Sequence, residues 1–215
     1  MSTRHGEQPT GDQPAPGEEH NPGPVSTARQ AATVILLRDG AQKLEVLLVR
    51  RTPQARFMGG VWVFPGGAVD DGDEDGDDAH RAAAIRELCE EASIALGDPR
   101  ALVKFSRWIT PAAVKVRFDT HFFLAELPDG QEPKVDDEEC VEFGWFTPRA
   151  ALEAHGAGKI MLVFPTIKHL EQLSEFEAVE ELLSYARGRE VQPIQPRVIL
   201  EGEVARVLLP GEPGY

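Results

Sequence analysis

A short stretch before the middle of the chain constrains most strongly what the rest can fold into and do. Residues 86–91 read R-E-L-C-E-E. On a helix, Glu87, Glu90 and Glu91 would share one face, because residues three and four apart are neighbours. Three ionised carboxylates so close repel one another unless a cation lies among them. Since a hard divalent cation such as Mg²⁺ prefers oxygen ligands, the pattern predicts a metal site on this helix.

Two glycines precede the helix in the segment F-P-G-G, residues 64–67. Glycine allows the backbone to approach a ligand closely or to adopt a positive φ. A strand over residues 61–64 that turns at Pro65 would place Gly66 and Gly67 beside the helix. We therefore expect a backbone carbonyl at this turn, assigned to Gly66, to be a further metal ligand.

Composition narrows the class of protein. A chain of 215 residues with 41% hydrophobic and 27% charged residues suits one soluble domain with a sizeable core. No stretch approaches the roughly 18 consecutive apolar residues of a membrane span, and the N-terminus has no apolar signal core. Two cysteines, Cys89 and Cys140, fit free thiols in a reducing cytoplasm. The net charge of −14 argues against nucleic acid as a partner, but a bound cation would still permit a small anionic substrate.

Hydrophobic periodicity and turn residues divide the chain into elements. Residues 1–27 have the composition of a disordered tail, and we expect His5 and His20 to be solvated there. A main domain over 28–187 and a C-terminal extension over 188–215 follow. Strands are predicted over 31–37, 44–49, 61–64, 102–109, 114–118, 121–127 and 141–146. Helices are predicted over 79–96, 147–156 and 165–187, and a hairpin over 198–209.

An acidic run, residues 70–78, separates the glycine turn from the helix. Its D-x-D-x-D-G-D pattern matches the first half of an EF-hand loop, but Ala82 stands where that loop needs glutamate. We therefore reject a calcium loop and expect a solvated segment. Asp77 or Asp78 would cap the following helix.

The stretch from Phe64 to Ile94 resembles the nudix box, whose pattern is G, five residues, E, seven residues, then R-E-U-x-E-E-x-G-U, with U a bulky aliphatic residue. Ser93 stands where glycine is usual and Asp73 where glutamate is usual. The span from Gly67 also exceeds the family spacing by about five residues, all before the helix. The residues that match are Gly67, Arg86, Glu87, Leu88, Glu90, Glu91 and Ile94.

A second resemblance lies upstream. Nudix hydrolases that cleave coenzyme A carry L-L-T-x-R-S-x-x-x-R-x-x-x-G-x-V-x-F-P-G-G, and residues 47–67 fit it in register. Val49 replaces Thr, Thr52 replaces Ser and Trp62 replaces the last Val. The segments W-I-T-P and R-F-D-T-H-F-F, residues 108–111 and 117–123, resemble the peroxisomal acyl-coenzyme A type, so the likeness covers roughly residues 30–185.

These resemblances imply a fold and a reaction. The fold is the nudix α/β/α sandwich, an α/β class with a mixed β-sheet, extended by a C-terminal helix and hairpin. The reaction is hydrolysis of a diphosphate linkage with Mg²⁺ or Mn²⁺, in coenzyme A or an acyl-coenzyme A. ADP-ribose, a nucleotide sugar or a dinucleotide is the alternative substrate, and a non-catalytic binding module is the alternative class. Nudix enzymes often dimerise, so a homodimer is also open by analogy.

The same resemblances assign roles to residues. Arginine binds phosphate through a planar donor fork, although a solvated loop balancing an acidic protein is the other interpretation of Arg50, Arg51 and Arg56. The acidic loop over 136–139 is either solvated or supplies a further carboxylate. The implied metal ligands are Glu87, Glu91, Glu90 and Gly66; the catalytic residues are Glu90, Arg86, which holds the glutamates, and Glu139; the substrate-binding residues are Arg51, Arg56 and Trp62.

Overall fold

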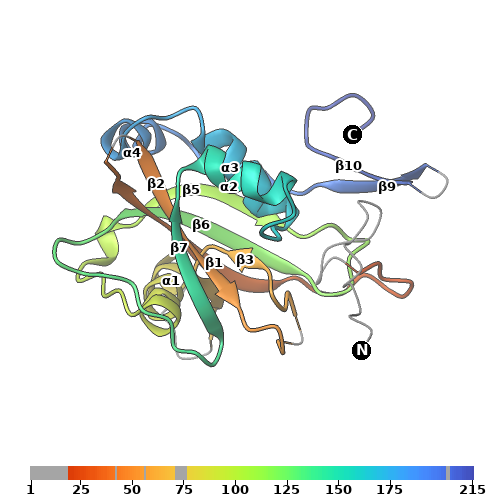
Figure 1. The fold of residues 1–215 in the computed structure, drawn as a ribbon. Coiled ribbons are helices and arrows are strands. Elements are labelled where there is room, and N and C mark those ends of the chain that lie inside the picture. Colours follow the sequence, from red (N-terminus) through yellow and green to blue (C-terminus); the bar gives the residue numbers. More distant parts are fainter. Residues whose placement is uncertain (1–18, 42, 56, 71–76, 202–203) are drawn as a thin grey trace.

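A mixed β-sheet between two layers of helices forms the body of the protein (Figure 1). The computed structural model describes residues 19–215 apart from 42, 56, 71–76 and 202–203. The helices are α1 (Asp77–Ala92), α2 (Pro148–Gly156), α3 (Phe164–Leu173) and α4 (Val179–Arg187), with a 3₁₀ turn η1 (Pro99–Ala101). The strands are β1 (Arg29–Asp39), β2 (Leu44–Arg51), β3 (Trp62–Val63), β4 (Gly66–Ala68), β5 (Val103–Ile109), β6 (Phe118–Glu126), β7 (Cys140–Phe146), β8 (Pro193–Ile194), β9 (Arg197–Glu201) and β10 (Val204–Leu208).

The main sheet has the order β3-β2-β1-β6-β5-β8, with β4 also paired to β1 and β7 also paired to β2. The pairs β1–β6 and β5–β8 are parallel and the other pairs are antiparallel. The predicted mixed sheet is therefore confirmed, and its strands β1 and β2 form a hairpin around Asp39 and Gly40. No helix among the described residues combines the length and apolar character needed to cross a bilayer.

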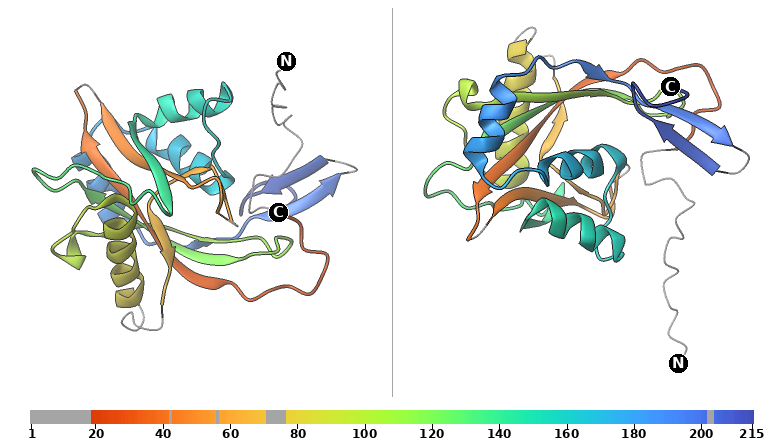
Figure 2. Two further views of the ribbon diagram at one scale, coloured as in Figure 1. Left: turned by 60° about the horizontal axis from the view of Figure 1, so that its bottom comes forward. Right: turned by 90° about the horizontal axis from the view of Figure 1, so that it is seen from above.

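Two cores cover opposite faces of the sheet, because alternate residues of a strand point to opposite sides. Ile35 and Leu37 of β1 pack beneath α2, α3 and α4. Val34 and Leu36 pack against α1. The two helical layers lie on opposite sides of the sheet in Figure 2 as well. Helix α1 therefore packs against β1 and β4. As a result, the glycine turn lies beside the glutamates of α1.

Helix α1 packs on the sheet through an apolar face, since Ala84, Leu88 and Ala92 are completely buried. It ends at Ala92 rather than at the predicted Leu96. Ser93 adopts a left-handed backbone conformation with φ of 56°, and its amide donates to the Cys89 carbonyl at 2.9 Å. This is the αL form of helix C-cap, which favours glycine. The nudix pattern has glycine at this position, and the structure shows the physical reason.

Replacing Ser93 with glycine should therefore stabilise the protein. A side chain in the left-handed region costs about 1–2 kcal/mol, whereas the added freedom of the unfolded chain costs about 0.4–1 kcal/mol. We expect Ser93→Gly to raise the free energy of unfolding by about 0.5–1 kcal/mol, measured by urea denaturation in EDTA. Ser93→Ala keeps the Cβ and should give no gain; an equal gain in both variants would contradict this account.

Two predicted elements differ in the structure. The helix predicted over 165–187 is two helices, α3 and α4, because the β1–β2 turn packs at the break between them: Asp39 accepts from the Val179 amide at 3.0 Å, and the Leu44 amide donates to the Glu177 carbonyl at 2.9 Å. Residues 114–118 form no separate strand. Most of this segment is a loop, with one bridge between His20 and Val114.

The N-terminal end of the described chain lies along this loop. The predicted tail includes residues 19–27, yet the Asn21 amide donates to the Ala113 carbonyl at 2.7 Å and Ser26 donates to the Lys115 carbonyl at 3.0 Å. Residues 1–18 lie outside the described residues, so the predicted disorder and the boundary at 27 stay predictions. The predicted C-terminal hairpin is present as β9 and β10, a separate two-stranded sheet.

Candidate active site

Glu91 is the most buried carboxylate of α1, with 2% of the residue exposed. Its two oxygens have different partners. The Gly66 amide donates to Oε2 at 2.9 Å, and the Arg51 guanidinium donates to Oε1 at 3.4 Å. The F-P-G-G turn and the end of β2 therefore both meet the acidic helix at this one side chain.

Glu87 lies one helical turn before Glu91, directly against the second glycine. A Cβ added at Gly67 would stand 2.2 Å from the Glu87 Oε1 atom, so only glycine leaves room for this carboxylate. Arg86 donates to Glu87 at 2.8 Å and to the Ala68 carbonyl at 3.0 Å. Arg86 thus ties the helix to β4, which agrees with its predicted role of holding the glutamates in place.

The electrostatics of these carboxylates are unusual. Burial raises the pKa of Glu91 to about 7, although the Gly66 amide and Arg51 oppose the rise. Burial also raises the pKa of Glu87, against the influence of Arg86. The negative charge of Glu139 adds to the rise in both groups, so Glu139 lies within their field. A cation between these side chains would relieve both the desolvation and the repulsion.

A cavity of about 790 Å³ opens from these carboxylates. Glu87, Glu91 and Glu139 line it, together with Arg51 and both glycines of the turn. The cavity then continues between β1, β5, β6 and the start of α3. A single space therefore joins the carboxylates to a distant second region.

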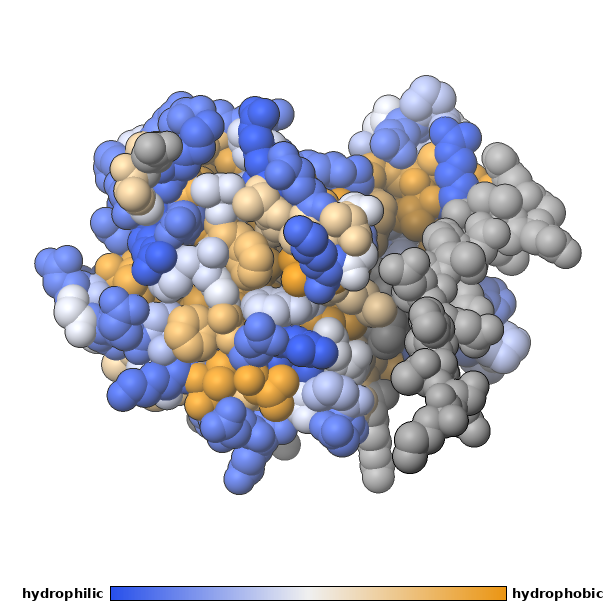
Figure 3. All heavy atoms as spheres, viewed as in Figure 1, coloured by the Kyte–Doolittle hydropathy of each residue, from blue (hydrophilic) through white to orange (hydrophobic). Residues whose placement is uncertain are grey.

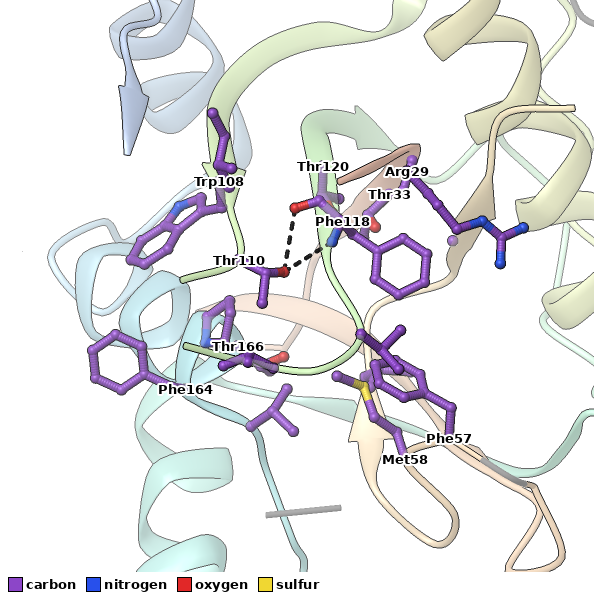
Figure 4. A pocket seen from close by; sticks show the side chains of 18 of the residues that line it. Arg29, Thr33, Phe57, Met58, Trp108, Thr110, Phe118, Thr120, Phe164 and Thr166 are labelled. Carbon is purple, nitrogen blue, oxygen red and sulfur yellow. Dashed lines mark hydrogen bonds between the residues drawn. The ribbon is translucent and has the colours of Figure 1, made fainter. Parts of the chain in front are cut away.

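The second region is mainly apolar, and we name it the apolar chamber. In Figure 4, Phe57, Met58 and Phe118 lie on one side of it, while Trp108 and Phe164 lie on the other. The Phe57 and Phe118 ring centroids are 5.6 Å apart, and those of Trp108 and Phe164 are 6.2 Å apart. The residues that define the chamber are Phe57, Met58, Trp108, Phe118, Phe164, Val198 and Val207.

Polar contacts hold together the elements that line the apolar chamber. Thr110 bonds the backbone of Phe118 twice, accepting from its amide at 3.0 Å and donating to its carbonyl at 3.2 Å (Figure 4). The buried His169 bonds Ser106 at 2.6 Å and the Pro165 carbonyl at 2.7 Å, and burial lowers its pKa to about 4. These bonds fasten the start of α3 to β5, so the chamber has a fixed wall.

Among the predicted substrate residues, the structure brings Arg51 to the cavity. Its Nε atom is buried and, within the described part of the chain, has no hydrogen-bond partner. An unpaired buried donor is costly, and an anionic group in the cavity could satisfy it. Arg50 instead pairs with Glu142 at 3.2 Å on the surface, and Arg56 lies outside the described residues.

Other predicted site residues lie elsewhere. Trp62 does not line the cavity: only 6% of it is exposed, and its ring packs on Phe146 in the core beneath α2 and α3. Glu90 does not line the cavity, has 59% of its side chain exposed and pairs with Arg86 at 3.1 Å. Of the acidic loop 136–139, Glu139 lines the cavity; Asp136 instead accepts bonds from the amides of its own turn.

Several lining residues escaped the sequence reasoning. Arg29 at the start of β1 lines the cavity, with its guanidinium 5.9 Å from the Phe118 ring centroid. His20, expected to be solvated, also lines it. Trp108, Thr110 and Phe118 belong to the W-I-T-P and R-F-D-T-H-F-F segments. The resemblance of these segments marked them as family motifs but assigned no function to their residues.

The donor set fits a magnesium-like ion. Among the described residues, no three Asp, Glu, His or Cys side chains lie close enough together to hold a metal ion by themselves. Mg²⁺ usually keeps several waters and takes one or two carboxylates together with substrate phosphates. Glu87 and Glu91, buried beside an open cavity, supply that type of site. Glu91 also accepts a hydrogen bond from the Gly66 amide. The glycine turn therefore holds the Glu91 carboxylate in position.

Comparison with known proteins identifies a family of similar sequences. A family model described as the NUDIX domain matches residues 27–163. This span includes the glycine turn, α1 and the acidic loop. It ends before α3, so the late helices and the C-terminal hairpin lie beyond the matched region.

Three curated relatives illustrate the similarity. A putative nudix hydrolase 7 of Caenorhabditis elegans is 30% identical over 211 residues, which cover 81% of this chain and 70% of that protein. The acyl-coenzyme A diphosphatase NUDT19 of Homo sapiens is 30% identical over 54% of this chain and 32% of its own length. The peroxisomal coenzyme A diphosphatase ndx-8 of C. elegans is 37% identical over 45% of this chain and 44% of its own length. The chain thus spans less than half of the two relatives named as diphosphatases.

Solved structures show the same fold. A NUDIX hydrolase of Alicyclobacillus acidocaldarius superposes with a TM-score of 0.67 at 29% identity, over 74% of this chain and 97% of that one. The NUDIX domain of Shewanella oneidensis NrtR, solved with ADP-ribose, has a TM-score of 0.54 at 18% identity, over 70% of this chain and 88% of that one. At that identity the second likeness concerns the fold alone.

Proposed function

The chain belongs to the NUDIX family, and on this premise we propose that it is a divalent-metal-dependent hydrolase of the diphosphate linkage in coenzyme A or an acyl-coenzyme A. The observation that carries the proposal is one cavity that joins buried carboxylates and Arg51 to an apolar chamber. A coenzyme A ester has a diphosphate at one position and an apolar group at its end. Two relatives bear the names of coenzyme A or acyl-coenzyme A diphosphatases.

The residues divide the work as follows. Glu87 and Glu91 are the proposed ligands of Mg²⁺ or Mn²⁺, which when bound would neutralise the diphosphate and lower the pKa of a water. Arg51 donates its unpaired Nε–H to a phosphate oxygen. Glu139 accepts a proton from the attacking water, whose oxygen bonds to one phosphorus while the bridging oxygen leaves with the other phosphate. Arg86 positions Glu87 and Glu90 through its hydrogen bonds to both carboxylates and to the Ala68 carbonyl of β4.

Four assignments stay predictions. Glu90 lies on the same helical turn but outside the cavity, so its place as ligand or base needs a direct test. Arg56 is the second arginine of the coenzyme A pattern, and its predicted contact with substrate is untested because it lies outside the described residues. The cytoplasmic location and a homodimer are expectations from composition and family analogy.

The first test is a substrate comparison with the purified full chain. With Mg²⁺ or Mn²⁺ we expect hydrolysis of coenzyme A or its esters to 3′,5′-ADP and the corresponding phosphopantetheine, because one cavity joins the carboxylates and Arg51 to an apolar chamber. ADP-ribose, NADH and a nucleotide sugar should react more slowly. Products are measured by chromatography, with EDTA as the metal-free control.

Other outcomes of that assay have definite meanings. Hydrolysis of ADP-ribose alone would keep the metal site and overturn the coenzyme A assignment. Tight binding without hydrolysis of any compound would favour the non-catalytic module. Glu90→Gln, compared with the exposed Glu175→Gln, decides the role of Glu90: a loss confined to the first variant would place Glu90 in the reaction.

A further inference from the structure

The C-terminal hairpin forms part of the cavity wall, although it lies beyond the region that the family model matches. Strand β8 pairs with β5 in the main sheet, where Ile194 is opposite Trp108, and leads into the hairpin. Leu208 is 2% exposed, and the Tyr215 hydroxyl donates to the Gln195 carbonyl at 2.8 Å. The base of the hairpin is therefore anchored beside the apolar chamber.

One face of this hairpin is directed at the chamber. Val198 and Val207 are directly opposite each other in the antiparallel register, so their side chains share a face. Both line the cavity. Arg206, the neighbour of Val207, points to the other face and is exposed. In Figure 3 the inner side of this C-terminal segment is apolar and its outer side is hydrophilic.

This arrangement indicates an apolar occupant. An isolated two-stranded hairpin is marginal in water unless another group covers its apolar face. Here the valine pair faces cavity space, across which lie the rings of Trp108 and Phe164 and the side chain of Met58. An apolar group in the cavity would remove all of these surfaces from water together.

We propose that the Val198–Val207 face and the apolar chamber bind the acyl chain of an acyl-coenzyme A, so that the hairpin gives the enzyme its preference for esters over free coenzyme A. This inference rests on the proposed function for the identity of the diphosphate end. It assigns specificity to a segment outside the matched family region. The chain length that fits is set by the chamber rather than by the carboxylate site.

The test compares decanoyl-coenzyme A with free coenzyme A. Val207→Thr is nearly isosteric with the native residue but places a hydroxyl in the chamber. We expect it to lower the ratio of kcat/KM for the ester to kcat/KM for coenzyme A by about fivefold or more, with kcat/KM for free coenzyme A unchanged. Arg206→Gln, on the opposite face of the same strand, is the matched control and should leave the ratio as in the native protein.

A second variant changes Met58, a chamber residue that does not belong to the hairpin. Met58→Gln keeps the length of the side chain and adds a polar amide, so it should lower the same ratio without touching the hairpin. Binding of both compounds is also measured by calorimetry in EDTA, where hydrolysis does not occur. The native protein should bind the ester at least about tenfold more tightly than coenzyme A, and each variant should reduce that difference.

The two proposals fail in different ways. Equal kcat/KM and equal affinity of the native protein for ester and free coenzyme A would overturn the acyl site while leaving a coenzyme A diphosphatase. A preference for the ester that neither variant changes would also overturn it. Tight ester binding that depends on Val207 and Met58, with no hydrolysis of either compound, would support the acyl site and refute the proposed reaction.

Discussion

Replacing Glu91 with glutamine should lower kcat/KM by about a thousandfold, the largest effect expected from any single substitution in this site. A metal-polarised reaction draws several kcal/mol of transition-state stabilisation from the ion, and each 1.36 kcal/mol corresponds to about tenfold in rate. Glu91 is the carboxylate that both the Gly66 amide and Arg51 hold in place. Glutamine keeps the shape and an acceptor for Gly66 but removes the charge that a divalent ion requires.

The fold should survive this change. Glu91 is almost fully buried, and a neutral amide is cheaper to bury than a carboxylate. We therefore expect the melting temperature of Glu91→Gln in EDTA to equal or exceed that of the native protein. Adding millimolar Mg²⁺ should raise the melting temperature of the native protein, because a ligand that binds only the folded state stabilises it, and should leave the variant unchanged.

Glu175→Gln is the matched control, since it makes the same chemical change at an exposed position between α3 and α4. Activity and the response to Mg²⁺ should be native in that variant. If Glu91→Gln retained more than a tenth of the native kcat/KM, Glu91 would not be a metal ligand. If it unfolded in EDTA, the carboxylate would have a structural role instead.

The parts of this protein that its sequence predicted well are those set by local spacing. The apolar face of α1 and the alternation of buried residues in β1 and β2 follow from residues three, four or two positions apart. The glycine turn and the glutamates come together as expected, because β4 pairs with β1 and α1 packs on the same strand. The mixed sheet followed from a family resemblance and not from periodicity.

Apart from the local cap at Ser93 that ends α1, the differences discussed next depend on contacts between distant segments. The predicted long helix is interrupted where Asp39, 140 residues away along the chain, caps the start of α4. Trp62 stands at a motif position where valine is usual, but the short strand β3 turns its ring toward Phe146 and the core. Val198 and Val207 were recognised as a hairpin, yet only the fold shows that their shared face borders the cavity. A linear pattern gives no information on which distant surface a strand will meet.

Alanine substitution at the two glycines of the turn should have different effects: Gly67→Ala should mainly lower activity, and Gly66→Ala should mainly lower stability. A Cβ at Gly67 would meet the Glu87 carboxylate at 2.2 Å. That carboxylate is the far end of a flexible side chain, so it can move aside at little cost in folding. A displacement of about 1 Å in a reacting site costs roughly a hundredfold in rate. Gly67→Ala should therefore fold normally and lose about a hundredfold in kcat/KM.

Gly66→Ala should behave in the opposite sense. Its Cβ would stand 2.5 Å from the Ala32 carbonyl oxygen and 2.7 Å from the Thr33 Cα atom, and backbone atoms in a central strand cannot move aside cheaply. This variant should lose several kcal/mol of stability, on the scale of an overpacked core. Gly97→Ala, where a Cβ meets nothing within 4 Å, is the control for both. Native activity in Gly67→Ala would show that the position of the Glu87 carboxylate does not matter for the reaction, and the assignment of Glu87 as a metal ligand would then be wrong.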